Sequence, residues 1–194
     1  TAFAAIHGGG TVVLHDDSKP FDARTILETV QRERVNLMSI VGDAFARRLI
    51  DEMRRTPYDL SSLTTLATGG AITSADSKQQ LLELLPNAII VDGYGASETG
   101  GMAFGATGRG GVSRTFSLGA GGAVLSADRS RFLSPGDDEV GWTARRGRVP
   151  LGYLGDRAKT EQTFPVIGGE RVAVPGDRAR LTPEGQVVLL GRDA

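Results

Sequence analysis

The spacing of hydrophobic and polar positions changes near the middle of the chain. In the first half, apolar residues follow strand and helix periods in turn. Asp22 and Ser74 stand where they can cap two of the helices. This order is typical of a parallel sheet covered by helices on both faces. The predicted strands are residues 11–14, 35–41, 63–68 and 88–92, and the predicted helices are residues 21–34, 43–55 and the segment after Ser74.

After residue 107 the pattern changes to short alternating runs separated by turn sequences such as SPGDD (134–138) and TPEG (182–185). Such runs predict antiparallel hairpin strands. One helical insert is expected over residues 156–164, and a Gly-rich mobile loop over 105–115.

The predicted fold class is therefore α/β, with two parts. Residues 1–107 are expected to form a parallel β-α-β sheet layer with flanking helices. Residues 108–194 are expected to form a small antiparallel β-barrel-like subdomain.

Composition excludes several classes of function. The net charge of -1 gives no basic surface for nucleic acid. The chain has no Cys, and its two His, His7 and His15, are too few for a convincing metal centre. No apolar run reaches the roughly 18 residues of a spanning helix. We expect a cytoplasmic protein without a transmembrane segment; the sequence leaves peripheral membrane contact and homo-oligomer formation open.

Glycine is the unusual component, with 27 copies among 194 residues, about twice the average usage of roughly 7%. The segment VDGYGASETGG (91–101) places Tyr94, Ser97 and Glu98 on a Gly-rich bend after a predicted strand end. Ligands of parallel sheets bind beyond such ends. A base could stack on Tyr94, the Ser97 hydroxyl could donate to a phosphate, and Glu98 could hold Mg²⁺.

Taken one at a time, these residues favour simpler interpretations. The bend is more often a structural turn than a nucleotide site. Asp177 alone fits an ordinary turn aspartate, and Arg192 alone fits a solvated charge near the chain end.

Their order along the chain carries more information. The segments YGASE (94–98), GYLGDRAKTEQTF (152–164), PGDRARL (175–181) and EGQVVLLGRD (184–193) together resemble the adenylate-forming superfamily of acyl-CoA synthetases, luciferases and nonribosomal adenylation domains. ATGGAITS (67–74) is similar to its Gly-Gly-Ala adenine loop, although Ile72 stands where proline is common. Ser97 stands where threonine is more frequent.

The resemblance covers essentially the whole chain. Residues 41–50 and 145–156 are similar to fatty-acyl and steroid-side-chain CoA ligases within the superfamily. It implies that a carboxylic acid reacts with the α-phosphate of Mg·ATP to give an acyl-adenylate, and that the CoA thiol then displaces AMP. ATP or AMP, Mg²⁺ and CoA are thus the implied cofactors and co-substrates.

The resemblance also implies roles for individual residues. Ser97 and Glu98 would be catalytic, at the α-phosphate and as the Mg²⁺ ligand respectively. The face of the Tyr94 ring, rather than its hydroxyl, would contribute by stacking on adenine. The residues implied to bind the nucleotide are Gly70, Ala71, Asp92, Gly93, Tyr94, Asp177 and Arg192, with Asp177 on the ribose; those implied to form the acyl pocket, where missing side chains leave a slot, are Val41, Gly42, Gly69 and Gly95.

The family's phosphate loop and C-terminal lid, each with a lysine, are absent from these 194 residues. We therefore expect the central fragment of a larger enzyme, ending at the hinge near Ala194 and inactive alone. Two alternatives stay open: a non-catalytic AMP-binding module, and a nonribosomal-type adenylation domain.

Overall fold

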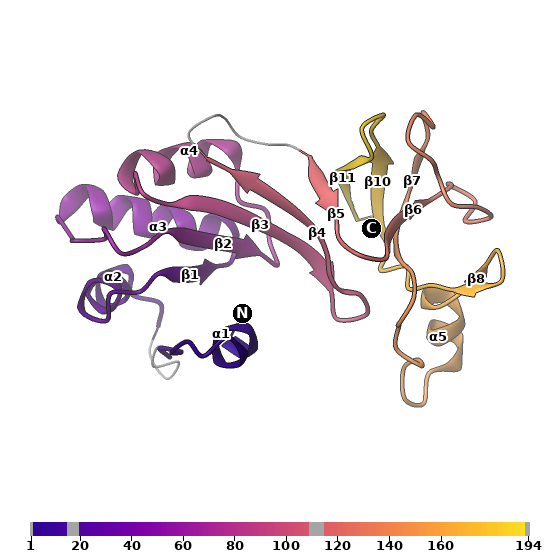
Figure 1. Cartoon of the computed structure of the whole chain (residues 1–194), viewed down its shortest axis with the longest axis horizontal. Coiled ribbons are helices and arrows are strands. Elements are labelled where there is room, and N and C mark those ends of the chain that lie inside the picture. The colour runs from indigo at the N-terminus through magenta and orange to yellow at the C-terminus, as the bar shows by residue number, and fades with distance from the viewer. Residues whose placement is uncertain (1, 15–19, 109–114, 193–194) are drawn as a thin grey trace. The chain divides into compact units, whose positions relative to one another are not determined.

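The computed structural model describes residues 2–14, 20–108 and 115–192 (Figure 1). The chain forms two units. The first contains the described residues up to Asp92, together with Thr107 and Gly108, and the second contains Gly93–Ala106 and the described residues from Thr115 onward. The division into two subdomains expected after residue 107 stays a prediction.

The first unit has the expected alternation of helices and strands. Strands β1 and β2 are parallel, and β2 is next to β3 in the sheet. Residues 11–14, predicted as a strand, have no regular structure; that prediction is wrong, because Leu14 is exposed and a short β-branched run needs a partner strand and a buried face. The elements are α1 (Ala2–His7), α2 (Ala23–Arg32), β1 (Leu37–Ile40), α3 (Gly42–Arg55), β2 (Thr65–Gly69), α4 (Ala75–Leu84) and the first half of β3 (Ile89–Ala96).

The two predicted helix caps are present. The side chain of Asp22 accepts a hydrogen bond from the backbone N–H of Arg24, and that of Ser74 accepts from Ser77. Each bond satisfies an N–H group that the first helical turn leaves without a partner. The caps explain why α2 and α4 begin at these positions.

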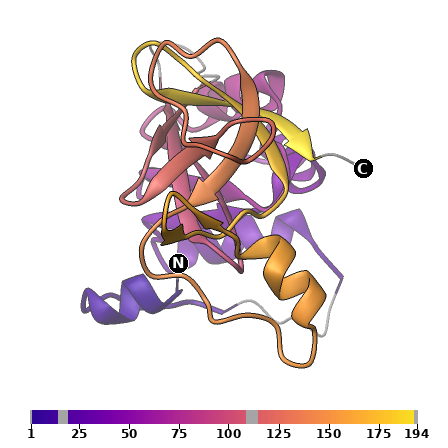
Figure 2. The same cartoon turned by 90° about the vertical axis from the view of Figure 1, so that its right-hand side faces the viewer.

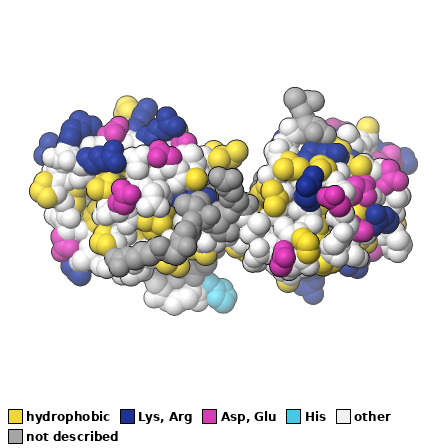
Figure 3. Space-filling view, turned by 90° about the horizontal axis from the view of Figure 1, so that it is seen from above, with side chains coloured by type: hydrophobic (Ala, Val, Ile, Leu, Met, Phe, Trp, Pro, Cys, Tyr) yellow, Lys and Arg dark blue, Asp and Glu magenta, His cyan; other side chains and the backbone are white. Residues whose placement is uncertain are grey.

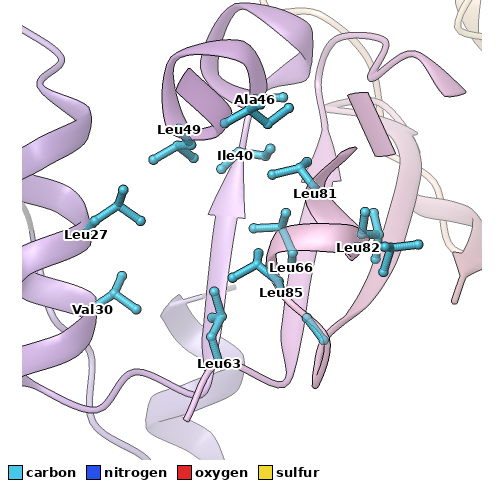
Figure 4. Packing of buried hydrophobic residues seen from close by; sticks show 13 residues of the cluster. Leu27, Val30, Ile40, Ala46, Leu49, Leu63, Leu66, Leu81, Leu82 and Leu85 are labelled. Carbon is cyan, nitrogen blue, oxygen red and sulfur yellow. The ribbon is translucent and has the colours of Figure 1, made fainter. Parts of the chain in front are cut away.

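The core of the first unit lies on one side of its strands. Figure 4 shows side chains from α2, α3 and α4 pointing toward those of β1 and β2. On the other side of the strands, Leu37 and Ile89 are 45% and 48% exposed. The expectation of helices on both faces is therefore not met among the described residues, because α2, α3 and α4 share one cluster. The buried members of that cluster include Leu27, Val30, Ile40, Ala46, Leu49, Leu63, Leu66, Leu81, Leu82 and Leu85.

The second unit is built from antiparallel strands, as predicted. From β4 the order is β4-β5-β11-β10-β7-β6, and each neighbouring pair in it is antiparallel. Among the described residues this order does not close on itself, so the barrel-like description is not confirmed. The elements are the second half of β3, β4 (Gly100–Thr107), β5 (Phe116–Leu118), β6 (Gly122–Leu125), β7 (Val140–Arg145), α5 (Arg157–Thr163), β8 (Val166–Ile167), β9 (Glu170–Arg171), β10 (Asp177–Leu181) and β11 (Gln186–Arg192).

Strand β3 is longer than predicted, since it continues from Asp92 to Ala96. A Cβ atom added at Gly95 would lie 2.1 Å from the carbonyl oxygen of Gly100. Glycine thus permits the close approach of backbone that the extended strand requires. The segment 105–115, predicted as a loop, begins with the end of β4, and residues 109–114 lie outside the described residues.

The helical insert of the second unit is confirmed as α5, which begins after Asp156. The Asp156 side chain accepts from the backbone N–H of Lys159 at 2.9 Å. Figure 2 shows α5 and the loop before it beyond one end of the strands of this unit. Figure 3 shows acidic and basic side chains interspersed on the visible face of each unit, in keeping with the net charge of -1.

Candidate functional site

Asp177 and Arg192 are paired across two neighbouring strands. Asp177 is the first residue of β10 and Arg192 is the last residue of β11, and they are directly opposite in the register. The register shifts between Arg178 and Ala179, as at a β-bulge. Because a one-residue shift reverses the face to which side chains point, the bulge lets this pair meet.

The two side chains form a bidentate ion pair. Nε of Arg192 donates to Oδ1 of Asp177 at 3.1 Å, and Nη2 donates to Oδ2 at 3.2 Å. The hydrogen bonds from the guanidinium to this carboxylate raise the pKa of Arg192. The Asp177 side chain is 15% exposed and that of Arg192 is 62% exposed. The carboxylate is therefore fixed, whereas the guanidinium has room to turn toward a ligand.

Tyr94 joins the same carboxylate from β3. Its hydroxyl donates to Oδ2 of Asp177 at 2.7 Å and lies 2.8 Å from Oγ1 of Thr143 on β7. Burial raises the pKa of the Tyr94 phenol, so this group stays protonated and remains a donor. The hydroxyl thus has two partners, which contradicts the expectation that only the ring face of Tyr94 matters.

The turn between β3 and β4 carries the other two predicted polar groups. Ser97 is exposed and Glu98 is partly buried. Thr99 is buried and holds the turn, because its hydroxyl accepts from the N–H of Ala96 at 2.9 Å and lies 3.0 Å from the carbonyl oxygen of Gly100. Thr99 is not among the residues predicted from the sequence, although a hydroxyl residue at a turn is a recognisable signal.

Glu98 accepts a short hydrogen bond from the hydroxyl of Tyr153, 55 residues away in the sequence. This hydrogen bond is the main reason that the pKa of Glu98 is lowered, and the charge of Lys159 adds to the effect. The same bond raises the pKa of Tyr153. Glu98 is therefore a carboxylate held in its ionised form.

Among the described residues, no three His, Asp or Glu side chains lie together as a metal site. Glu98 could therefore serve only as a single metal ligand, and not as part of a protein cage. Mg²⁺ usually binds through one or two carboxylates together with substrate phosphates. The donor set around Glu98 fits a magnesium ion that arrives with a nucleotide.

An open hollow of about 520 Å³ lies beside Tyr94 in the second unit. Its volume is within the usual range of small-molecule sites, about 300–1,000 Å³. Tyr94 and Ser97 supply its polar groups and Phe104 an apolar ring. Its lining residues are Gly93, Tyr94, Gly95, Ala96, Ser97, Gly100, Gly101 and Phe104.

Both carboxylate oxygens of Asp92, in the first unit, have side-chain partners. Nζ of Lys78 donates to Oδ2 of Asp92 at 2.7 Å, and the hydroxyl of Thr68 donates to Oδ1 at 2.6 Å. Both Asp92 and Lys78 are 7% exposed. The structure therefore gives Asp92 a partner set inside the first unit, and its predicted place near a base stays a prediction.

The other predicted residues of the first unit lie around the segment after β2. Gly42 is close to this segment, since a Cβ atom added to it would lie 2.8 Å from Cβ of Ala71. Gly70, the residue after Gly69 at the end of β2, would likewise place a Cβ 3.7 Å from Val41. The structure thus brings together Val41, Gly42, Gly69, Gly70 and Ala71.

Two of the glycines predicted for the acyl pocket do not leave empty space. The Cβ position of Gly42 is filled by Ala71 and that of Gly95 by Gly100. Both glycines are needed for close packing of the chain on itself. Their role beside a substrate stays a prediction. The reason given for it, that missing side chains leave a slot, does not apply at these two positions.

Asp43 fastens the same segment to the start of α3. Its Oδ1 accepts from the backbone N–H of Ser74 at 2.8 Å and lies 3.0 Å from the Ser74 hydroxyl. The backbone N–H of Asp43 donates in turn to the carbonyl oxygen of Ile72 at 3.1 Å. This reciprocal contact fixes the segment that contains Gly70 and Ala71.

Within the second unit the structure unites Tyr94, Asp177 and Arg192, and it places Glu98 with Tyr153. Sequence reasoning missed Thr143 and Tyr153 as partners of these groups. Tyr153 lies within the recognised segment 152–164, which was a usable signal. The sequence around Thr143 gave no such signal, because it is an ordinary strand pattern.

No helix among the described residues is long and apolar enough to cross a membrane. The family model described as "AMP-binding enzyme" matches residues 1–140. A medium-chain acyl-CoA ligase of Mycobacterium avium is 46% identical, with 100% of this chain and 36% of the relative aligned. A 3-oxocholest-4-en-26-oate–CoA ligase of Rhodococcus rhodochrous is 37% identical over 98% of this chain and 35% of the relative. The chain thus spans about a third of the length of these relatives.

Solved structures support the same fold. An NRPS protein containing adenylation and PCP domains has a TM-score of 0.77 at 24% identity, covering 98% of this chain and 39% of that one. A protein described as a putative long-chain-fatty-acid CoA ligase from Rhodopseudomonas palustris has a TM-score of 0.69 at 25% identity, covering 89% and 41%. With the family model matching more than half of its residues, this chain belongs to the AMP-binding enzyme family.

Proposed function

We propose that this chain forms the adenylate-binding part of an AMP-forming acid–CoA ligase. The observation that carries the proposal is the joining of Tyr94, Asp177 and Arg192 in one hydrogen-bonded group beside an open hollow. Tyr94 on β3 is 83 positions from Asp177 on β10, and Arg192 lies on the next strand, β11. An aromatic ring, a carboxylate and a guanidinium suit a base, a ribose and a phosphate respectively. The family relationship supports this assignment.

In the proposed complex, the Tyr94 ring stacks on adenine and Asp177 accepts hydrogen bonds from the ribose hydroxyls. A carboxylate has about four acceptor positions, and Tyr94 and Arg192 occupy three of them. When the exposed Arg192 turns toward the phosphates, it frees two of these positions for the ribose. The predicted adenine contacts of Gly70, Ala71, Asp92 and Gly93 belong to the same proposal.

In the first chemical step, an oxygen of the substrate carboxylate forms a bond to the α-phosphorus of ATP. The bond from that phosphorus to the bridging oxygen breaks, and pyrophosphate leaves with its electron pair. Ser97 can donate to an α-phosphoryl oxygen, where charge develops, and Arg192 adds a positive charge. Mg²⁺, held by Glu98 and the phosphates, would supply further charge neutralisation there.

In the second step, the thiol of CoA attacks the acyl carbonyl and AMP leaves, while the thiol proton passes to solvent or a base. Two relatives are named for medium-chain and steroid-side-chain acids. We therefore propose a fatty or steroid-side-chain acid as the substrate, with Val41, Gly42, Gly69 and Gly95 beside it. A cytoplasmic location, peripheral membrane contact and homo-oligomer formation stay predictions.

A pyrophosphate-release assay tests the proposal on the protein that carries these 194 residues. Medium-chain fatty acids, steroid-side-chain acids and amino acids would each be supplied with ATP and Mg²⁺, with and without CoA. We expect pyrophosphate release with fatty or steroid acids, and acyl-CoA formation when CoA is present. AMP binding without pyrophosphate release from any acid would favour the non-catalytic module, and release with amino acids alone would favour a nonribosomal-type adenylation domain.

A further inference from the structure

The second unit holds the ring of Tyr153 firmly through its neighbours in α5. The backbone N–H of Tyr153 donates to the hydroxyl of Thr160 at 2.9 Å, and that hydroxyl donates to the backbone carbonyl of Asp156 at 2.6 Å. Nζ of Lys159 lies 4.4 Å from the centre of the Tyr153 ring, and the ring of Phe164 lies 5.7 Å away. The ring therefore has defined contacts on several sides.

The residue before Tyr153 makes this arrangement specific. A Cβ atom added at Gly152 would lie 2.5 Å from Cγ2 of Thr160, and Gly152 has a φ of +152°. Only glycine lets the chain approach α5 so closely without displacing Thr160. Backbone, helix and ring contacts thus combine to present one group, the Tyr153 hydroxyl.

That hydroxyl donates to Oε1 of Glu98. A phenol proton uses one acceptor position of a carboxylate that has about four. The bond therefore fixes the direction of the Glu98 carboxylate and leaves acceptor positions for a cation. Hydrogen bonds of this kind orient the carboxylates that bind metals, and their loss typically weakens metal affinity about 10- to 100-fold.

We propose that Tyr153 is a positioning residue, which holds the Glu98 carboxylate in the direction that binds the magnesium ion of the nucleotide. The proposal rests on the proposed function, because Glu98 has its metal role only there. Tyr153 itself touches neither the metal nor the reacting atoms. Helix α5 is then the support of the metal ligand, which gives the helical insert of this unit a function.

The first test replaces Tyr153 by Phe, which keeps the ring and removes only the hydroxyl. We expect the Mg²⁺ concentration for half-maximal pyrophosphate release to rise about 10-fold. The KM for ATP at saturating Mg²⁺ and the maximal rate should change much less. A merely structural tyrosine would lower the rate at every Mg²⁺ concentration without changing this requirement, which would overturn the proposal.

The chain offers a matched control in Tyr58, whose hydroxyl donates to Oε1 of Glu52 at 2.8 Å in the first unit. Tyr58→Phe removes the same kind of hydrogen bond from Glu52, a carboxylate that is not among the proposed site residues. It should leave the Mg²⁺ requirement unchanged. An equal rise in Tyr58→Phe and Tyr153→Phe would show a general effect of stability and contradict the proposal.

A second test does not depend on turnover. Manganese binding in the presence of ATP, without an acid substrate, can be followed by electron paramagnetic resonance. We expect Tyr153→Phe to weaken Mn²⁺ binding about 10-fold, and to add little when Glu98 is already Gln. An additional 10-fold loss in the Glu98→Gln background would show that Tyr153 acts by another route and overturn the proposal.

The two tests separate this proposal from the proposed function. A wild-type protein that releases no pyrophosphate with any acid contradicts the proposed function. Equal Mn²⁺ affinity in wild type and Tyr153→Phe contradicts the role of Tyr153, whatever the turnover. Melting temperatures of all variants show whether a variant folds, and the comparison within the Glu98→Gln background stays decisive when stability falls modestly.

Discussion

The hydroxyl of Tyr94 donates to Oδ2 of Asp177 at 2.7 Å, although 83 residues separate them in the sequence. The same carboxylate accepts hydrogen bonds from both Nε and Nη2 of Arg192. Tyr94 thus contributes a ring face to the hollow and a hydrogen bond to the residue assigned to the ribose. The three side chains depend on one another, so their substitutions should not act independently.

Tyr94→Phe is expected to weaken ATP binding, because Asp177 loses a donor and the Thr143 hydroxyl loses a partner. One net hydrogen bond corresponds to about 1 kcal/mol, which is roughly a fivefold rise in the KM for ATP. Tyr94→Ala should cost about 1–3 kcal/mol more, since stacking is lost as well. Steady-state kinetics checks both values, and an unchanged KM in Tyr94→Phe would show that the hydroxyl is dispensable.

Asp177→Ala is expected to weaken ATP binding by about 2–4 kcal/mol, because the two charge-assisted hydrogen bonds that we propose between Asp177 and the ribose would be lost. Arg192→Lys is a useful comparison, since it keeps the charge and loses the two-pronged geometry. It should affect ATP binding less than Asp177→Ala does. Isothermal titration with a non-hydrolysable ATP analogue measures both, and equal affinity of wild type and Asp177→Ala would remove Asp177 from the site.

Glu98→Gln is expected to lower kcat more than it raises the KM for ATP. The metal that Glu98 is proposed to bind would matter most as charge develops on the α-phosphoryl group. Extra Mg²⁺ should partly restore the rate. Full activity of Glu98→Gln at limiting Mg²⁺ would contradict this prediction and would show that Glu98 has no role in metal binding.

The sequence predicted the regular elements well where apolar spacing was strong. Helices α2, α3 and α5 begin within two residues of the predicted starts, and the caps at Asp22 and Ser74 are present. The errors occur where pairing between strands, and not the local sequence, determines whether a segment is a strand. Residues 11–14 look like a strand in isolation, and β3 continues through Gly93 and Gly95 because its backbone lies close to β4.

The same distinction applies to the candidate site. Ordered motifs indicated Tyr94, Glu98 and Asp177, since each lies in a recognisable segment. The contacts that Thr143 and Tyr153 make with them became visible only with the fold, because contacts between residues 49 and 55 positions apart leave no local pattern. The bulge in the register of β10 and β11 could not be predicted from the local sequence either.

The pH dependence of stability should reveal the Asp43–Ser74 contact. The hydrogen bond from the backbone N–H of Ser74 lowers the pKa of Asp43, and bonds from Ser77 and Ser74 side chains add to this. The ionised form therefore stabilises the fold fully above the unfolded-state pKa of about 3.9, and this contribution is lost as pH falls through the lower folded-state value.

Asp43→Asn removes that contribution. Between neutral pH and about pH 3, a range set by that unfolded-state value, the free energy of unfolding should fall less steeply in Asp43→Asn than in wild type. Urea unfolding at several pH values gives the slopes, and identical slopes for wild type and Asp43→Asn would show that this contact contributes no pH dependence.

The last prediction concerns the buried ion pair of the first unit. Nζ of Lys78 lies 2.7 Å from Oδ2 of Asp92, and both residues are 7% exposed. Lys78→Met keeps most of the side-chain volume but leaves the carboxylate buried without its cation. We expect a loss of about 3–5 kcal/mol in the free energy of unfolding, as for other buried pairs that lose one partner.

Asp92→Asn in the Lys78→Met background should recover part of that loss. The amide is neutral, nearly the same size, and its oxygen can still accept from Thr68, which donates to Asp92 at 2.6 Å. Asp92→Asn alone should destabilise, because Lys78 then carries the unpaired charge. The double variant is thus expected to be more stable than the sum of the two single changes, by an amount that a double-mutant cycle in urea measures. Additive effects, or a loss below about 1 kcal/mol in Lys78→Met, would mean that solvent reaches this pair.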